Sequence, residues 1–301
     1  MKHARADVAP AALSAAKWTA VLGDYVALTK PRLNLLVVLS SAAGYYLGAA
    51  GRIDWTTMLQ AVVGTALVAG GAAVLNQLYE LETDALMRRT RLRPLPDGRV
   101  APPDARAFGL VLAAAGLLLL ALAANGTAAA LALCTIVVYL LIYTPMKRRS
   151  PLATLVGAVP GALPPLIGWT AARGTVSWGG LSLFAIVFLW QIPHFMAIAW
   201  LYREDYRKAG FPLLPVVEPD GRRTGRQAVL YAAALLPVSL APAWFAVARL
   251  GYVAAATVLS LTLVWLALRF ASDRSERSAR ALFLGSIAYL PLLWAVMILD
   301  H

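Results

Sequence analysis

Nine long apolar runs are the feature that most limits what this chain can fold into. They lie at 33–50, 56–79, 106–124, 127–145, 152–171, 178–201, 228–249, 252–270 and 281–299. A helix needs roughly 20 residues to cross about 30 Å of hydrocarbon, and each run is close to that length. Charged residues make up only 14% of the chain, whereas soluble domains contain about a quarter. We therefore predict an all-α, polytopic protein with nine transmembrane helices, whose solvent is the lipid bilayer.

The whole chain, residues 1–301, is predicted to be a single transmembrane domain with residues 1–24 as an N-terminal tail. The tail has no continuous apolar core followed by a small-residue cleavage site, so we predict no signal peptide. Cys134 is the only cysteine, which excludes an intrachain disulfide and a metal cluster built from cysteines.

Basic residues are distributed unevenly between the connections that join the spans. Of the 27 Lys and Arg residues, all but Arg52, Arg173 and Arg249 lie in the tail and in alternate connections. Connections rich in Lys and Arg stay in the cytoplasm, so we expect a cytoplasmic N-terminus and an external C-terminus. The same segregation explains the net charge of +12 without a nucleic-acid partner, and we expect none.

A polar block interrupts the apolar pattern at the end of the second span. Residues 76–99 read NQLYELETDALMRRTRLRPLPDGR. Asn76, Glu80 and Asp84 are four residues apart, which places them on one face of a helix over about two turns. Carboxylates at the edge of a span are costly and usually functional, and oxygen ligands of this kind suit Mg²⁺. The spacing predicts a magnesium site, and the alternative is a solvated acidic face.

Arginines follow these acids on the same predicted helix, which we expect to continue as far as Pro94. Guanidinium groups bind phosphate through two parallel N–H bonds. Arg89 and Arg93 are therefore predicted to bind a diphosphate, whereas Arg88 and Arg91 are interpreted as markers of membrane topology.

Other candidate residues lie at the cytoplasmic ends of further spans. Tyr143 and Lys147 are four residues apart, and Lys147 either neutralises a leaving phosphate or anchors its helix at the membrane surface. The same two alternatives apply to Lys30, Arg32 and Asn34, which surround the start of the first span.

The fifth and sixth spans contain residues that are unusual in lipid. Three prolines in the fifth span predict a kinked or broken helix, whose backbone neighbours must satisfy unless it lines a cavity. His194 lies about three turns before Asp205 in the sixth span. This histidine is either a satisfied core residue or a contact for substrate or iron.

A second polar block, residues 202–226, follows the sixth span. Glu204 and Asp205 precede Arg207 and Lys208 and then the sequence FPLLP. This repeats the order of acids, bases and paired prolines in the first block, which suggests an ancient duplication. Four spans separate the blocks, so both are expected on the cytoplasmic side.

The first block resembles the N-x-x-x-D-x-x-x-D motif of the UbiA superfamily of intramembrane prenyltransferases. The stretches TKPR, YTPMKRRSP, PGALPPLIGWTA, QIPHF and YREDYRKAGFPLLPVV are similar to its protohaem IX farnesyltransferase, or haem O synthase, branch. The resemblance is strong over the first six spans. The chain departs from the superfamily at Glu80, where Asp is usual, and at Ala209, where many relatives outside this branch have a further Asp.

The resemblance implies nine helices around a central cavity, in a bacterial cytoplasmic membrane with the active site on the cytoplasmic side. It implies transfer of the farnesyl group of farnesyl diphosphate to a vinyl group of haem B, giving haem O and diphosphate. A haem A synthase is then a candidate partner. The implied metal ligands are Asn76, Glu80 and Asp84 for one Mg²⁺ and Glu204 and Asp205 for a second, with Asn76, Glu80, Asp84 and Asp205 as catalytic residues. The implied substrate-binding residues are Arg89, Arg93, Tyr143, Lys147, Lys30, Arg32, Asn34, His194 and Lys208.

Two alternative functions stay open at this point. A related prenyltransferase could act on another acceptor, such as a hydroxybenzoate or a chlorin. An ion-coupled transporter would also combine spans, prolines and acids. Transporters place their charged site near the membrane midplane, however, whereas both acidic blocks here lie at one membrane face.

Overall fold

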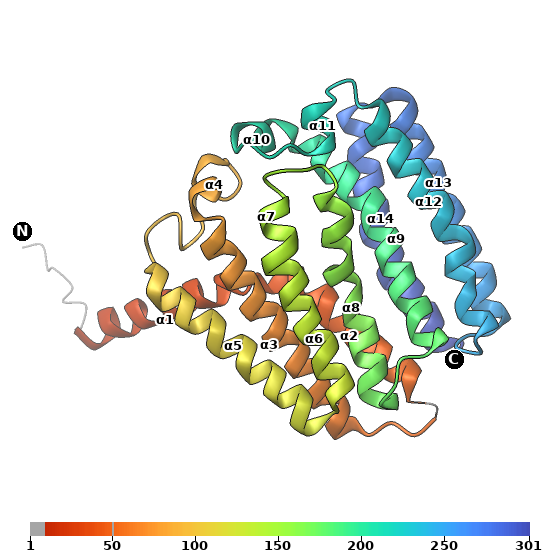
Figure 1. Ribbon diagram of the computed structural model, residues 1–301, viewed down its shortest axis with the longest axis horizontal. Helices are drawn as coiled ribbons and strands as arrows, with labels where there is room; N and C mark the ends of the chain where they lie inside the picture. The colour runs from red at the N-terminus through yellow and green to blue at the C-terminus, as the bar shows by residue number, and fades with distance from the viewer. Residues whose placement is uncertain (1–9, 50) are drawn as a thin grey trace, which may run out of the picture.

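The computed structural model describes residues 10–49 and 51–301, and these contain helices and loops but no β-strand. In Figure 1 the long helices lie side by side in one bundle. Three short helices, α4 (Leu81–Leu86), α10 (Arg203–Lys208) and α11 (Leu214–Val217), lie together at the upper end of the bundle in that view. Residues 10–28 of the expected N-terminal tail form helix α1 (Pro10–Leu28) at one side.

Eight helices of the described residues are long and apolar enough to cross a membrane. They are α3 (Trp55–Tyr79), α5 (Pro102–Ala123), the continuous segment Gly126–Met146, α8 (Ala153–Arg173), α9 (Trp178–Leu201), α12 (Arg222–Trp244), α13 (Leu250–Asp273) and α14 (Glu276–Leu299). The first expected span forms α2 (Pro31–Gly48), whose polar start PRLN lowers its mean hydropathy. Because α2 packs against α3 and α8 within the same bundle, the predicted all-helical membrane architecture is confirmed.

Helix α8 is held very close to α2. The expected break in this helix is wrong, since α8 is continuous in spite of its three internal prolines. A Cβ atom on Gly44 would overlap the carbonyl oxygen of Pro165, and one on Gly168 would overlap that of Ser41. Small residues that let helix backbones touch are a common means of packing in lipid, where the hydrophobic effect does not drive helices together.

The bundle contains two large apolar cores. One joins α9, α12, α13 and α14 to α2 and α8, and it includes the buried rings of Trp190, Tyr252 and Tyr289. The other lies between α2, α3, α5, α6 (Gly126–Val137) and α8. Large apolar side chains such as Leu122 and Leu284 are exposed on the outside of the helices. An outer surface of this composition suits contact with lipid tails.

Candidate active site

The first polar block lies at the junction of α3 and α4. Helix α3 ends at Tyr79, Glu80 departs from helical geometry (φ −94°, ψ 12°), and residues 87–99 form turns. The predicted continuous helix to Pro94 is therefore wrong. The amide of Glu80 nevertheless donates to the carbonyl of Asn76 (2.9 Å), and the amide of Asp84 donates to that of Glu80 (2.7 Å). These bonds carry the four-residue register of the three side chains across the junction.

Both carboxylates of this register are buried and paired with basic side chains. Glu80 is 4% exposed and Asp84 is 1% exposed. Lys147 donates to both carboxylate oxygens of Glu80, at 3.0 and 3.2 Å. Arg93 donates to Oδ2 of Asp84 at 2.6 Å. A buried carboxylate is stable only with such partners, so the local fold demands positive charge at this position.

Asn76 connects the same face of the site to two other parts of the chain. Its Oδ1 accepts a hydrogen bond from Nζ of Lys30 (3.3 Å), and its Nδ2 donates to the hydroxyl of Thr144 (3.2 Å). That hydroxyl donates in turn to the carbonyl of Tyr139 at 2.7 Å. The α1–α2 loop, α3 and the end of the fourth span are thereby joined at the metal-site candidate.

The two lysines of the site differ in their electrostatic state. Burial is the main cause that lowers the pKa of Lys30 to about 7, and Arg93 and Lys147 lower it further, while Glu80 opposes them. Burial also acts against the charge on Lys147, but Tyr143 and Glu80 outweigh it and raise its pKa above the ordinary value. A bound phosphate would favour the charged form of Lys30, because an anion raises the pKa of a nearby amine.

The fourth span changes its helical geometry where it reaches the site. Residues Val138–Tyr143 form a π-helix, η1, followed by the short helix α7 (Thr144–Met146). Tyr143 stacks on Tyr139 with 5.5 Å between ring centroids, and Lys147 lies 4.9 Å from the centroid of the Phe211 ring. π-helical turns are rare and are frequent at functional sites. Here the turn brings an aromatic pair next to the charged cluster.

The second polar block lies on α10 and is much more open to solvent. Glu204 is exposed and forms an ion pair with Arg207 at 2.7 Å. The hydrogen bond from Arg207 is the main cause that lowers the pKa of Glu204. Asp205 is half-buried, and its carboxylate has no printed partner among residues 10–49 and 51–301, while Lys208 is exposed.

Residues from the two polar blocks contact each other. The guanidinium of Arg89 donates to the hydroxyl of Tyr206 (3.3 Å) and lies 5.0 Å from the ring centroid of Tyr202. Met87 packs in an apolar cluster with Tyr206 and Phe211. A cavity of about 450 Å³ lies between the blocks, lined by Arg88, Arg89, Leu201, Tyr202, Glu204 and Asp205. The fold therefore forms one composite site from segments that are more than 100 residues apart in the chain.

The oxygen donors of the first block fit magnesium. The described part of the chain has no group of three or more His, Cys, Asp or Glu residues placed to hold a metal. Mg²⁺ needs only one or two protein carboxylates, because water and substrate phosphates complete its shell. Glu80, Asp84 and the amide oxygen of Asn76 supply such a set, and cations already contact all three side chains.

Some predicted site residues lie away from the charged cluster. Arg32 is exposed, and Asn34 donates to the carbonyl of Thr29 (2.6 Å) within its own turn. His194 contacts Ser286 of α14 inside the bundle. Conversely, the sequence reasoning did not single out Thr144 or Tyr206. Both lie inside quoted motifs, YTPMKRRSP and YREDY, which were the available signal.

Residues 37–289 match the UbiA prenyltransferase family, so the chain belongs to that family. Among its relatives, the protoheme IX farnesyltransferase of Koribacter versatilis (strain Ellin345) is 47% identical over 292 residues, which cover 93% of this chain and 94% of the relative. The protoheme IX farnesyltransferase of Anaeromyxobacter sp. (strain Fw109-5) is 46% identical over 297 residues, or 98% of this chain and 97% of the relative.

Solved structures share the fold at lower identity. A digeranylgeranylglyceryl phosphate synthase structure superposes with a TM-score of 0.79 and 18% identity, over 93% of this chain and 98% of that chain. A UbiA homologue from Archaeoglobus fulgidus, bound to GPP and Mg²⁺, superposes with a TM-score of 0.61 and 17% identity, over 91% of this chain and 99% of that chain.

Proposed function

We propose that this protein transfers the farnesyl group of farnesyl diphosphate to a vinyl group of haem B, giving haem O and diphosphate, for the haem of cytochrome oxidase. Relatives that are 41–47% identical over most of the chain bear the name protoheme IX farnesyltransferase. The structural observation that carries the proposal is the buried pair of carboxylates surrounded by basic side chains from three other segments.

The charged cluster is suited to bind a diphosphate. Lys147, Arg93 and Lys30 contact the three oxygen-bearing side chains directly, and Arg89 lies at the neighbouring cavity. Mg²⁺, when bound to these oxygens, supplies charge that stabilises the departing diphosphate. The basic side chains then turn from protein carboxylates to phosphate oxygens, which arginine binds with two parallel bonds.

The reaction needs a site that separates charge and excludes water until the new bond has formed. The bond between C1 of the farnesyl group and oxygen breaks, and its electron pair leaves with the diphosphate. The vinyl group of haem B supplies the pair for the new carbon–carbon bond, and the resulting cation takes up water and loses a proton. The apolar helices below the charged cluster are suited to exclude water from the first cation.

The remaining assignments belong to the same proposal. Glu204 and Asp205 are proposed ligands of a second Mg²⁺, with Lys208, Arg32 and Asn34 at the edge of the substrate site and Tyr143 beside the diphosphate. His194 is proposed to contact haem. Haem A synthase is the proposed recipient of the product, and residues 1–301 are proposed to act as one domain.

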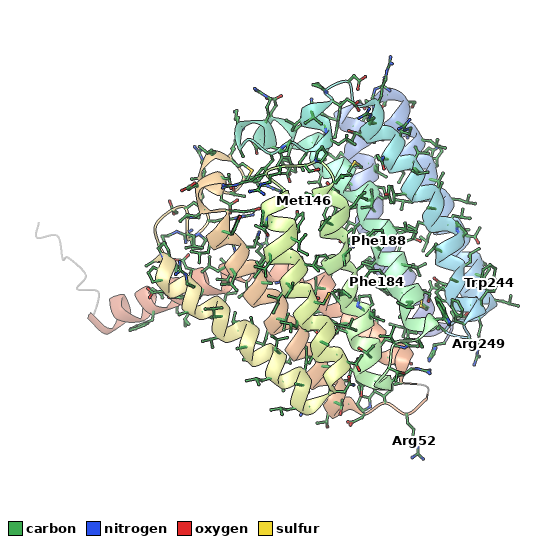
Figure 2. The ribbon with its side chains drawn as sticks, in the orientation of Figure 1. Arg52, Met146, Phe184, Phe188, Trp244 and Arg249 are labelled. Atoms are coloured by element: carbon green, nitrogen blue, oxygen red, sulfur yellow. The ribbon has the colours of Figure 1, made fainter. Side chains whose placement is uncertain are left out.

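We further propose that the protein lies in the bacterial cytoplasmic membrane with the N-terminus and the active site on the cytoplasmic side. In Figure 2, Met146 lies near the bundle end that bears α4 and α10, whereas Arg52 and Arg249 lie at the other end. The strong bias of basic residues toward the α4 and α10 end supports this orientation.

Product analysis with the purified protein in lipid nanodiscs tests the proposal. With haem B, farnesyl diphosphate and Mg²⁺ we expect haem O, measured by liquid chromatography and mass spectrometry. Removal of divalent metal with EDTA should abolish turnover, and added Mg²⁺ should restore it. Prenylation of a hydroxybenzoate or a chlorin in place of haem B would contradict the proposed acceptor. Ion-driven uptake into proteoliposomes without any prenyl transfer would indicate a transporter.

A further inference from the structure

The ring of His194 is clamped between two aromatic side chains. It stacks on Trp190 of the same helix with 5.2 Å between centroids and 19° between planes. On its other contact it stacks on Phe283 of α14, at 5.2 Å and 28°. An imidazole held in this way has a fixed plane, so the directions of its two nitrogen atoms are fixed as well.

Ser286 of α14 determines which nitrogen of that ring carries the proton. Nδ1 of His194 lies 2.8 Å from the hydroxyl oxygen of Ser286. The same hydroxyl donates its hydrogen to the carbonyl of Phe283 at 2.7 Å. Because a serine hydroxyl has one hydrogen, its oxygen must act as the acceptor toward His194. Nδ1 therefore carries the N–H, and Nε2 keeps a free electron pair.

Ser286 also fixes one of the two clamping rings. Its backbone carbonyl accepts a hydrogen bond of 2.7 Å from the indole nitrogen of Trp190. The serine itself is fully buried, at 0% exposure. One residue thus orients the imidazole through its side chain and the neighbouring indole through its backbone.

The other nitrogen of His194 is open toward the candidate site. Nε2 has no hydrogen-bond partner among the described residues, and it does not belong to their buried, unpartnered polar atoms. His194, Ile198 and Leu201 follow the spacing i, i+4, i+7 and are all half-buried, so they form one stripe along α9. Leu201 lines the cavity between the polar blocks, and His194 lies about 10 Å below it along the helix.

From this geometry we infer that Ser286 is a positioning residue for the haem substrate. It holds His194 in the tautomer whose Nε2 can bind the haem iron, while the porphyrin extends along the stripe toward the charged cluster. The inference rests on the proposed function. Partners that hold the outer N–H of a metal-binding imidazole commonly set its tautomer and raise its basicity.

Haem-binding spectroscopy tests this arrangement on the full-length protein in nanodiscs. Ferric haem B bound to the wild type should show an iron–imidazole signature in absorption and electron paramagnetic resonance. His194→Gly should lose that signature, and added imidazole should restore it. Ser286→Ala should weaken haem binding by about 10- to 100-fold and change the signature, while KM for farnesyl diphosphate stays the same. Ser286→Thr keeps a hydroxyl and should resemble the wild type.

Ser182→Ala is the matched control. Ser182 is a buried serine of α9 whose hydroxyl donates to a backbone carbonyl three residues earlier, and it has no histidine contact among the described residues. The inference is overturned if Ser286→Ala behaves like Ser182→Ala, or if His194→Gly keeps the wild-type signature. If Ser286→Ala fails to fold, the Thr variant and the imidazole rescue decide. Haem O formation with unchanged spectra rejects this inference alone, whereas a wild type that neither binds haem nor forms haem O rejects the proposed function as well.

Discussion

The two polar blocks have the same order of acids, bases and prolines, but the fold gives them opposite environments. In the first block, the side chains of Glu80 and Asp84 are 5% and 1% exposed and are paired with Lys147 and Arg93. In the second, Glu204 has a side chain that is 65% exposed, and its partner Arg207 is equally open at 63%. Sequence similarity between the blocks therefore does not extend to their electrostatics.

This difference assigns unequal tasks to the two blocks. A buried charge interacts strongly with its neighbours because little water screens it, whereas an exposed ion pair contributes little. We expect the first block to supply most of the binding energy for metal and diphosphate. The second block, which reaches the first through Arg89 and Tyr206, is expected to complete the site from its outer side.

The largest effect is expected at Asp84. Asp84→Asn removes a buried negative charge next to Arg93 and should lower kcat/KM by about 10³-fold, a loss typical of removing one preorganised electrostatic contact. Steady-state haem O formation measures the change, and thermal unfolding shows how much of it is structural. Asp97→Asn, at an exposed acid of the same block, is the control. Near-wild-type activity of Asp84→Asn would remove the first block from the metal site.

A smaller effect is expected in the second block. Asp205→Asn should raise the Mg²⁺ concentration needed for half-maximal activity by about 10- to 100-fold, the range seen when a metal site loses an outer partner. Glu204→Gln should have a weaker effect, since its carboxylate is exposed and already paired with Arg207. A magnesium titration of activity compares both variants. Equal losses for Asp84→Asn and Asp205→Asn would show that the two blocks act as equivalents.

The contact between the blocks should contribute less again. Tyr206→Phe removes the hydroxyl that accepts from Arg89, a bond worth about 1 kcal/mol, so KM for farnesyl diphosphate should rise about fivefold. The rate at saturation should change little. Tyr79→Phe, at an exposed tyrosine beside the first block, serves as control. No change in KM would mean that Arg89 binds diphosphate without help from the second block.

The smallest effect concerns the exposed pair itself. Arg207 holds the pKa of Glu204 below its usual range, so Arg207→Gln should let that pKa rise toward the ordinary glutamate value. The charged carboxylate then becomes protonated at a higher pH than in the wild type. Carboxyl carbon NMR of labelled protein follows this titration, and haem O formation near pH 7 should change by less than about twofold. A large loss of activity would instead place Arg207 in the substrate site.

Much of the fold could be predicted from the sequence, because span length and the bias of basic residues report directly on the bilayer. The break at Glu80 could not be predicted, since neither Pro nor Gly stands there to signal it. The pairing of Lys147 with Glu80 joins residues 67 positions apart, and that of His194 with Ser286 joins residues 92 apart. Such partners depend on how helices are rotated against each other, which a single sequence does not specify.

The π-helical turn at residues 138–143 limits the chain in a different way from the residues of the site. A π-turn closes its hydrogen bonds over five residues instead of four, so it holds an additional residue within the helix. Loss of one residue there would restore the α-helix and rotate everything that follows by about 100°. Tyr143, Thr144 and Lys147 would then leave the site together, with no side chain altered. This segment should therefore tolerate exchanges of apolar side chains but no change in its number of residues.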